Sequence, residues 1–227
     1  MNDASPDVSA SCQALVTQAR DALPQVLGDL VDVVPVLQTL TAEWHHRLIR
    51  PMGAPTCVRT CAKLIHLYNF RLWHTEDTAR RPDAPDSLMA QCKRAIDADN
   101  QQRHNHIERL DGLLFTYLYE THEKRAPGAA LHSETPGSLV DRLSILALKM
   151  YHMAAAAERH DATAQHQHQC RQRLVMLAEQ RDDLWMCLCR LCVDLWQGRA
   201  TFKIYRQFKM YNDPELNPEI YRHRVDR

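Results

Sequence analysis

Apolar residues recur every three or four positions along much of the chain, which is the spacing of helices that bury one face. The clearest example begins at Leu174, where leucines follow at positions 177, 184, 188, 191 and 195 before Gly198. The chain has only six glycines, and none lies in a strand-turn-strand pattern. We therefore predict an all-α fold without strands.

Prolines, glycines and capping residues place the helix boundaries. Thr135 offers a capping hydroxyl immediately before Pro136, a residue favoured in the first turn, and marks the sharpest start. The segment that follows is apolar almost all round and should be the central helix. We predict about five main helices, over residues 37–49, 56–81, 87–124, 135–157 and 174–198.

These helices are predicted to form a single-domain bundle, because a chain of 227 residues can share one core. Pro24 and Gly28 interrupt the first 30 residues, which we expect to be loosely ordered. Aromatic residues recur every third position from Phe202 to Tyr211 and favour a docked tail. The predicted organisation is a loosely ordered segment at 1–30, a helical bundle at 31–198 and a tail packed on the bundle at 199–227.

Charge and cysteine usage narrow the class of partners. The chain carries 28 basic and 28 acidic side chains, so we expect no nucleic-acid partner, because such proteins need a basic face. No apolar run is long enough to span a membrane and no signal peptide is visible, so we expect a cytoplasmic protein. The eight cysteines are expected to be reduced thiols packed in the core.

In two segments, cysteines or histidines cluster in the sequence, but their spacing does not suit the binding of a metal ion. Cys187 and Cys189 would point about 200° apart on a helix, so we expect these residues and Cys192 to pack in the core and not to bind zinc. The His- and Gln-rich stretch from His160 to Cys170 could be a loop or an exposed helical continuation. It lacks carboxylates at useful spacing, so we expect a solvated linker there and not a metal-binding tract.

Polar residues that interrupt the apolar stripes are the candidates for function, because a buried polar group without a partner costs about 1–3 kcal/mol. One such residue is Arg103, which lies between two apolar turns of the helix at 87–124. A buried guanidinium there needs a carboxylate or a bound anion as its partner. The candidate catalytic residues are Glu76, Asp77, Asp141, Lys149 and His152. The candidate ligand-binding residues are Asn69, Trp73, His74, Arg80, Asn100, Arg103, Glu108, Asp111, Glu134, Arg142, Arg206 and Lys209.

The same residues also allow a purely structural interpretation. Glu76 and Arg80 have the i,i+4 spacing of an ordinary ion pair on a helix flank. Arg103 could be neutralised by a protein carboxylate such as Asp77. A di-iron site of the ferritin type is disfavoured, because it needs two Glu-x-x-His pairs and the chain offers only the one that begins at Glu43.

Three separated motifs carry a resemblance to a known family. They are WHTEDTAR from Trp73, SETPGSLVDRLSIL from Ser133 with the nearby Lys149 and Tyr151-His152-Met153, and YRQFKMYNDP from Tyr205. Over roughly Leu64 to Pro218 the chain resembles the bacterial family catalogued as domain of unknown function 4254. The resemblance implies no particular reaction. Members of that family are often encoded near genes for lipopolysaccharide or other envelope glycans, which implies a link to envelope glycan metabolism by association.

We expect the candidate residues to converge on a polar pocket between helices that binds or turns over a phosphorylated small molecule, such as a sugar phosphate or a nucleotide sugar. The carboxylates could hold a divalent metal ion through oxygen ligands. The alternative is a non-catalytic helical scaffold, whose polar core fixes helix register and whose tail binds a partner. Whether the protein is an enzyme, and its oligomeric state, stay open at this point.

Overall fold

The computed structural model of the protein describes residues 6–121, 127–206 and 215–217. These residues form seven helices and two short strands: α1 (Ala10–Ala22), α2 (Gln25–Val31), α3 (Val33–His46), α4 (Val58–Ala79), α5 (Asp86–Thr121), β1 (Ala130–His132), α6 (Pro136–Ala157), α7 (Ala164–Trp196) and β2 (Ala200–Phe202). The predicted all-α bundle is confirmed, whereas the prediction of no strands is wrong.

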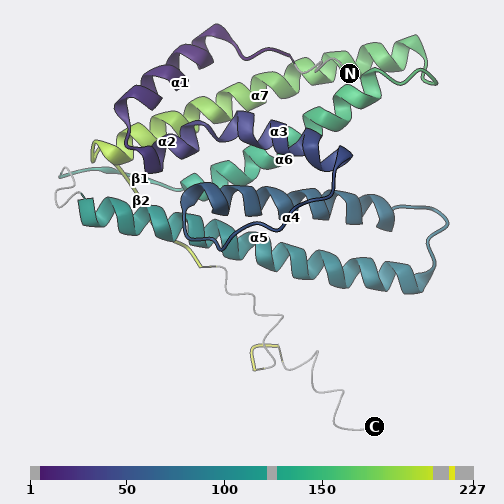
Figure 1. Ribbon diagram of the computed structural model, residues 1–227, viewed down its shortest axis with the longest axis horizontal. Helices are drawn as coiled ribbons and strands as arrows, with labels where there is room; N and C mark the ends of the chain where they lie inside the picture. The colour runs from purple at the N-terminus through teal and green to yellow at the C-terminus, as the bar shows by residue number, and fades with distance from the viewer. Residues whose placement is uncertain (1–5, 122–126, 207–214, 218–227) are drawn as a thin grey trace.

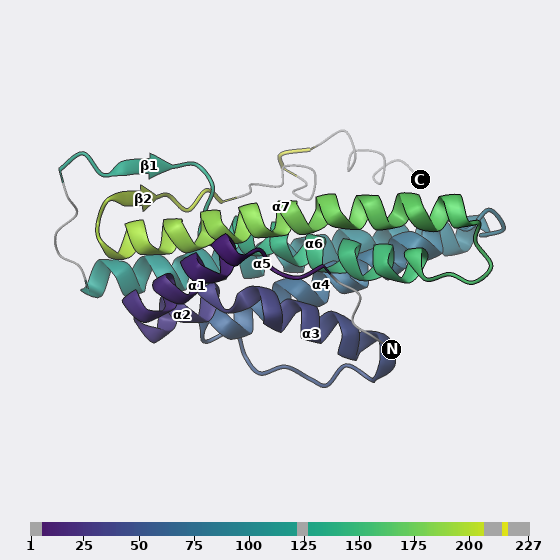
Figure 2. The same ribbon diagram turned by 90° about the horizontal axis from the view of Figure 1, so that it is seen from above.

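Two long helix pairs form the body of the molecule (Figure 1). α4 pairs with α5 across a loop that contains Pro82 and Pro85. Pro82 cannot continue the hydrogen bonding of α4, and the Pro85 carbonyl accepts from Leu88 N–H in the first turn of α5 at 2.9 Å. α6 pairs with α7 across residues 158–163, and α1 lies along α7 in both views (Figure 2). α6 also packs against α3, α4 and α5, so it is the central helix that its apolar sequence predicted.

The strongest sequence signals for helix ends are confirmed. Thr135 caps α6 by accepting from Ser138 N–H at 3.1 Å, while the Ser138 hydroxyl accepts from Thr135 N–H at 3.0 Å. Gly198, with φ +71°, follows the end of α7. Of the two forms expected for the stretch at 160–170, a loop or an exposed helical continuation, the second holds from Ala164, where α7 begins with largely exposed turns.

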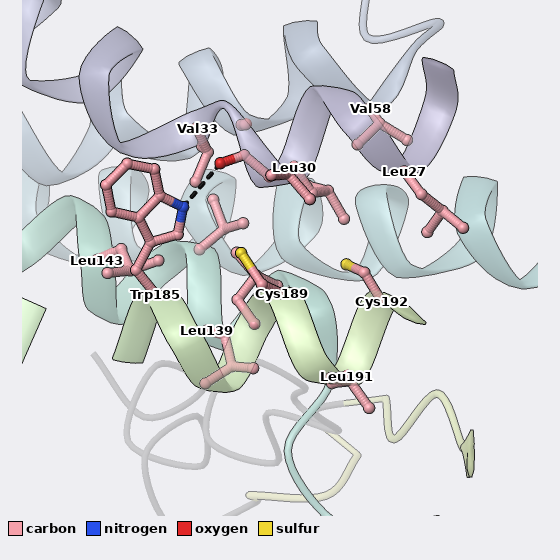
Figure 3. Packing of buried hydrophobic residues seen from close by; sticks show 14 of the residues in the cluster. Leu27, Leu30, Val33, Val58, Leu139, Leu143, Trp185, Cys189, Leu191 and Cys192 are labelled. Atoms are coloured by element: carbon pink, nitrogen blue, oxygen red, sulfur yellow. Dashed lines mark hydrogen bonds between the residues drawn. The ribbon is translucent and has the colours of Figure 1, made fainter. Parts of the chain in front are cut away.

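The first 30 residues are more ordered than expected, since they contain α1 and most of α2. Pro24 caps the start of α2 instead of ending the structure, and Gly28 is buried within it. Leu27 and Leu30 are fully buried in the main core. Figure 3 shows this packing, together with the Trp185 indole N–H, which donates to the carbonyl of the last α2 residue at 2.7 Å.

The two strands pair in parallel, with Ala130 opposite Ala200 and His132 opposite Phe202. Three-residue strands are too short to show a period of two, which explains why the sequence did not reveal them. Ala200 and Phe202 are buried against the bundle. The packing of the whole tail at 199–227 stays a prediction, because residues 207–214 and 218–227 lie outside the described part.

Two further expectations concern membranes and thiols. No helix among the described residues is long and apolar enough to cross a membrane. All eight cysteines are free thiols, and of the four on α7 only Cys187 is exposed. Burial raises the pKa of Cys189 to about 12, so this thiol stays protonated and packs as a small apolar residue.

Candidate functional site

Polar side chains from α4, α5 and α6 meet between these helices. Asn69 of α4 donates from Nδ2 to Asp141 Oδ1 at 2.8 Å and to Ser144 Oγ at 3.0 Å, both on α6. Arg103 of α5 donates from Nη1 to Asn69 Oδ1 at 3.1 Å, and its Nε lies 3.9 Å from Asp141 Oδ1. The carboxylate that neutralises Arg103 is therefore Asp141. The suggested partner Asp77 is wrong, because that residue is exposed on α4.

The hydrogen bonds continue from Ser144 to α3 through a buried histidine. The Thr41 hydroxyl donates to the Leu37 carbonyl at 2.8 Å, so it accepts from His66 Nε2–H at 2.9 Å. His66 Nδ1 then accepts from the Ser144 hydroxyl at 2.8 Å. Burial lowers the pKa of His66 to about 3, which keeps the ring neutral. The donors all point from Asn69 toward α3, and hydrogen bonds aligned in this way strengthen one another.

A cavity of about 260 Å³ opens beside Asp141. Its lining comes from α5, the start of α6 and the chain on either side of the two strands: His104, Ile107, Glu108, Asp111, Ser133, Thr135, Ser138, Asp141, Ile204 and Tyr205. Both described contacts of Asp141, with Asn69 and Arg103, use Oδ1. The contacts that hold Asp141 inside the bundle therefore share one carboxylate oxygen, and the residue itself lines the cavity.

Asp111 holds the start of α6 against α5. Its Oδ1 accepts from Gly137 N–H at 2.7 Å, and burial raises the pKa of the carboxyl to about 6. A Cβ added to Gly137 would lie 2.8 Å from Asp111 Oδ1 and 2.9 Å from the Ile107 carbonyl oxygen. Glycine is required here because any side chain would force the two helices apart.

Three histidines from three helices form a second polar cluster. His45 lies in the last turn of α3, His74 on α4 and His152 on α6, and one ring nitrogen of each lies within 4.8 Å of the others. The Nε2 atoms of all three are buried and make no hydrogen bond. His45 Nδ1 lies 2.7 Å from the Thr41 carbonyl oxygen. Because a carbonyl only accepts, Nδ1 carries the proton and His45 Nε2 presents a lone pair.

Aromatic side chains enclose the histidine cluster. Trp73 stacks on His152 with the ring centroids 4.7 Å apart, and Tyr151 stacks on His45 at 4.1 Å. Phe70 meets the His45 ring edge-on at 4.9 Å. The two stacked rings fix the planes of the His152 and His45 imidazoles, and the aromatic enclosure keeps water away from the histidine nitrogens that point into the cluster.

Burial also sets the protonation state of the cluster. The pKa of His152 is lowered to about 4, mainly by burial and in smaller part by the nearby His45 and His74. Burial and the nearby His45 likewise lower the pKa of His74. The negative charge of Asp77 has the opposite, weaker effect on the pKa of both rings. His74 and His152 are therefore neutral at pH 7, the form that accepts hydrogen bonds and binds metal ions.

Several predicted site residues form local ion pairs away from these clusters. Glu76 and Arg80 pair at 3.2 Å along the flank of α4, as the structural interpretation expected. Glu134 and Arg142 pair at 2.5 Å at the start of α6. Lys149 is exposed on α6.

Three other predicted ligand-binding residues, Asn100, Arg206 and Lys209, are not seen in either cluster. Asn100 is half-buried on α5, one turn before Arg103. Arg206 is exposed in the segment after β2. Lys209 lies outside the described residues. The predicted residues thus do not share one pocket: some meet at Asp141 and its cavity, and others at the histidine cluster.

Four members of the two clusters were not predicted from the sequence: Thr41, His45, His66 and Ser144. A weak signal for His45 existed in the His45-His46 pair that ends the helix at 37–49. The periodicity of one helix, however, does not show which of its side chains meets those of another. His66 and Ser144 lie within apolar stretches and resemble ordinary core positions.

The fold and the sites define the chain as a helical bundle with a buried polar network and a separate cluster of three histidines. Residues 59–204 match the family model Protein of unknown function (DUF4254), and the chain belongs to this family. The match covers α4 to α7 and both strands, but not α3, which supplies Thr41 and His45. Neither a curated protein nor a solved structure matched the chain.

Proposed function

We propose that the protein binds a small hydroxyl-rich molecule, such as a sugar phosphate or a nucleotide sugar, in the cavity beside Asp141. The observation that carries the proposal is the placement of this carboxylate. Its Oδ1 is held by Asn69 and Arg103 inside the bundle, while the residue also lines the cavity. A carboxylate fixed in one orientation by protein partners is preorganised to bind a hydroxyl group or a metal ion.

The cavity lining supports a sugar group. Glu108 adds a second carboxylate, and Tyr205 adds an exposed aromatic ring. Carboxylates accept hydrogen bonds from sugar hydroxyls, and an aromatic face packs against the apolar side of a sugar ring. The volume of about 260 Å³ is below the range of about 300–1,000 Å³ for drug-sized ligands, so one sugar unit fits and a larger ligand would extend outside.

A phosphate group on this ligand would need an accompanying cation. The backbone N–H groups at the start of α6 are already used, since Gly137 donates to Asp111 and Ser138 donates to Thr135. The carboxylates of Asp141 and Glu108 would repel a bare phosphate. We therefore propose that a divalent cation such as Mg²⁺, bound through carboxylate oxygens, accompanies a phosphorylated ligand.

The second candidate is a non-catalytic helical scaffold, and one observation favours it. The chain of hydrogen bonds through Asn69, Ser144, His66 and Thr41 gives each of these side chains a protein partner. Such a closed network can serve to fix the register of α3, α4 and α6 without any ligand. The two candidates predict different responses to small molecules.

The test measures melting temperature with a panel of sugars, sugar phosphates and nucleotide sugars, with and without Mg²⁺. A ligand present at about 100 times its dissociation constant stabilises the folded state by about 2.7 kcal/mol, which raises the melting temperature by roughly 5–10 °C for a chain of this size. Asp141→Asn keeps the shape of the side chain but removes its charge. We expect this variant to lose the shift.

Glu134→Gln is the matched control, because Glu134 pairs with Arg142 and does not line the cavity. It should keep the full ligand-induced shift. The scaffold candidate is supported instead if no compound raises the melting temperature of the unmodified protein while Asp141→Asn lowers it without any ligand.

A further inference from the structure

We infer that His45, His74 and His152 form a binding site for a first-row transition metal ion, and we name Zn²⁺ as this ion. The inference is independent of the proposed function at Asp141, because it uses different residues. It rests on two observations: one ring nitrogen of each histidine lies within 4.8 Å of the others, and the Nε2 atom of each is buried without a hydrogen-bond partner.

The geometry is close to that of a metal site. Two nitrogens that bind one tetrahedral zinc ion, with Zn–N bonds of about 2.0–2.1 Å, lie about 3.3–3.4 Å apart. The histidine nitrogens lie within 4.8 Å of one another. Each ring would have to move inward by less than about 1 Å to reach these bond lengths, which small side-chain rotations supply without moving a helix.

The alternative, a cluster of ordinary core histidines, leaves a physical problem. A buried acceptor or donor without a partner costs about 1–3 kcal/mol, and here three Nε2 atoms lack one. His66 shows how this chain satisfies a structural histidine, because both of its ring nitrogens are hydrogen-bonded to hydroxyl groups. His106 Nδ1, outside the cluster, is also buried without a partner, so it is the meeting of three such histidines from three helices that favours a bound ion.

The surroundings orient the rings as metal ligands require. The Thr41 carbonyl accepts from His45 Nδ1–H at 2.7 Å and so directs the Nε2 lone pair of His45 into the cluster. A second hydrogen bond of this kind is characteristic of histidines that bind metals. Trp73 and Tyr151 hold the planes of His152 and His45 by stacking.

The ligand set selects the type of ion. Neutral imidazoles suit zinc, copper, nickel and iron, whereas Mg²⁺ and Ca²⁺ prefer oxygen ligands. Among the described residues, the cluster contains three histidines and no thiolate or carboxylate. Three protein ligands leave a fourth tetrahedral position for water or another small molecule, as in catalytic rather than structural zinc sites.

The experiment measures zinc bound to purified full-length protein that has first been stripped with a chelator. Competition titration and elemental analysis give the affinity and the stoichiometry, with Mg²⁺ as the negative control. We expect one zinc ion per chain. His45→Gln, His74→Gln and His152→Gln should each weaken binding by at least about 100-fold, because even replacing a group that only orients a ligand costs about 10–100-fold.

A second measurement keeps the test independent of folding. Circular dichroism and the melting temperature without metal must show that each Gln variant is folded. If one variant is not folded, the remaining two Gln variants decide the test. Co²⁺ in place of Zn²⁺ should give the visible spectrum of a tetrahedral site, and this spectrum should be absent in the folded variants.

The matched control addresses the exposed histidines at the start of α7, which could bind zinc on the surface. A variant with His166→Gln and His168→Gln leaves the cluster intact and should keep the single tight site. The inference is overturned if the unmodified protein binds no zinc, or if binding is lost in this control but kept in the cluster variants. Asp141→Asn should retain zinc, which separates this test from that of the proposed function.

Discussion

At the scale of single residues, Thr41 connects the two polar clusters. Its hydroxyl accepts from His66, which leads through Ser144 to Asn69, while its carbonyl accepts from His45. One residue of α3 therefore orients a histidine in each cluster. A side-chain change at Thr41 should remove the hydrogen bond to His66 but keep the carbonyl that orients His45, and changes at Asp141 or His152 should likewise stay local.

The buried His66 makes stability depend on pH. The pKa of its ring is about 3 in the folded protein and 6.5 in a solvated histidine, so the unfolded chain binds more protons between these values. Stability therefore falls as pH decreases from about 6.5 toward 3. His74 and His152 act in the same direction, whereas Asp111, whose pKa is raised, acts in the opposite one.

His66→Leu isolates this contribution. At pH 7.5 we expect the variant to be less stable by about 1–3 kcal/mol, because Ser144 loses its acceptor. The difference from the unmodified protein should shrink as the pH is lowered to 4.5, since the leucine cannot be protonated. Urea unfolding with chelator at several pH values measures it. A difference that is constant across this range would show that His66 does not stay neutral in the folded protein.

At the scale of helices, the close contact between the start of α6 and α5 positions the cavity. Gly137 allows the approach, and Asp111 and the cap at Thr135 fix the first turn. The SETPGS segment is thus explained by the geometry of a helix start beside another helix. Its glycine, capping threonine and first-turn proline are needed to form and pack the start of α6, whether or not a ligand binds.

Gly137→Ala should destabilise the protein by about 1–3 kcal/mol, because the added methyl group overlaps Asp111 and Ile107. Gly112→Ala, on α5, is the matched control. Nothing lies within 4 Å of a Cβ at that position, so alanine should stabilise the helix by about 0.5–1 kcal/mol. Urea unfolding of the two variants should shift in opposite directions, and equal shifts would contradict the close packing at Gly137.

The five main helices and the central position of α6 followed from the sequence, because each depends on the period of a single segment, whereas α1 and α2 did not. Thr135-Pro136 marked a start for a local reason, and Leu174 to Leu195 marked a buried face. The histidine cluster did not follow, because it depends on how far α3, α4 and α6 are shifted along one another. Asn69, Arg103 and Asp141 were found as polar residues in apolar faces, but their pairing became visible only with the helices in place.

At the scale of the whole molecule, a buried ion pair fastens the N-terminal segment to the bundle. Arg181 and Asp182 of α7 pair at 2.9 Å and are almost fully buried. The Arg181 guanidinium donates to the carbonyls of Pro6 and Asp7, and Asp182 accepts from Ser9 N–H at 2.8 Å. Residues 6–9, the first that the structure describes, are therefore part of the folded unit.

Arg181→Met should lower the free energy of unfolding by about 3–5 kcal/mol, because it leaves the Asp182 carboxylate buried without its partner. The double variant Arg181→Met with Asp182→Leu should recover much of the loss. Arg173→Met, at an exposed position of the same helix, should change stability by less than about 0.5 kcal/mol. Equal effects at the two arginines would contradict the role assigned to the buried pair.

The most direct test of the central claim, that α3, α4 and α6 bring three histidines to one metal-binding point, is X-ray diffraction from crystals of the zinc-loaded protein, recorded on both sides of the zinc absorption edge. The account predicts an anomalous peak between the Nε2 atoms of His45, His74 and His152. Bound zinc with no peak at this position, found instead only at surface residues such as His166 and His168, would contradict it.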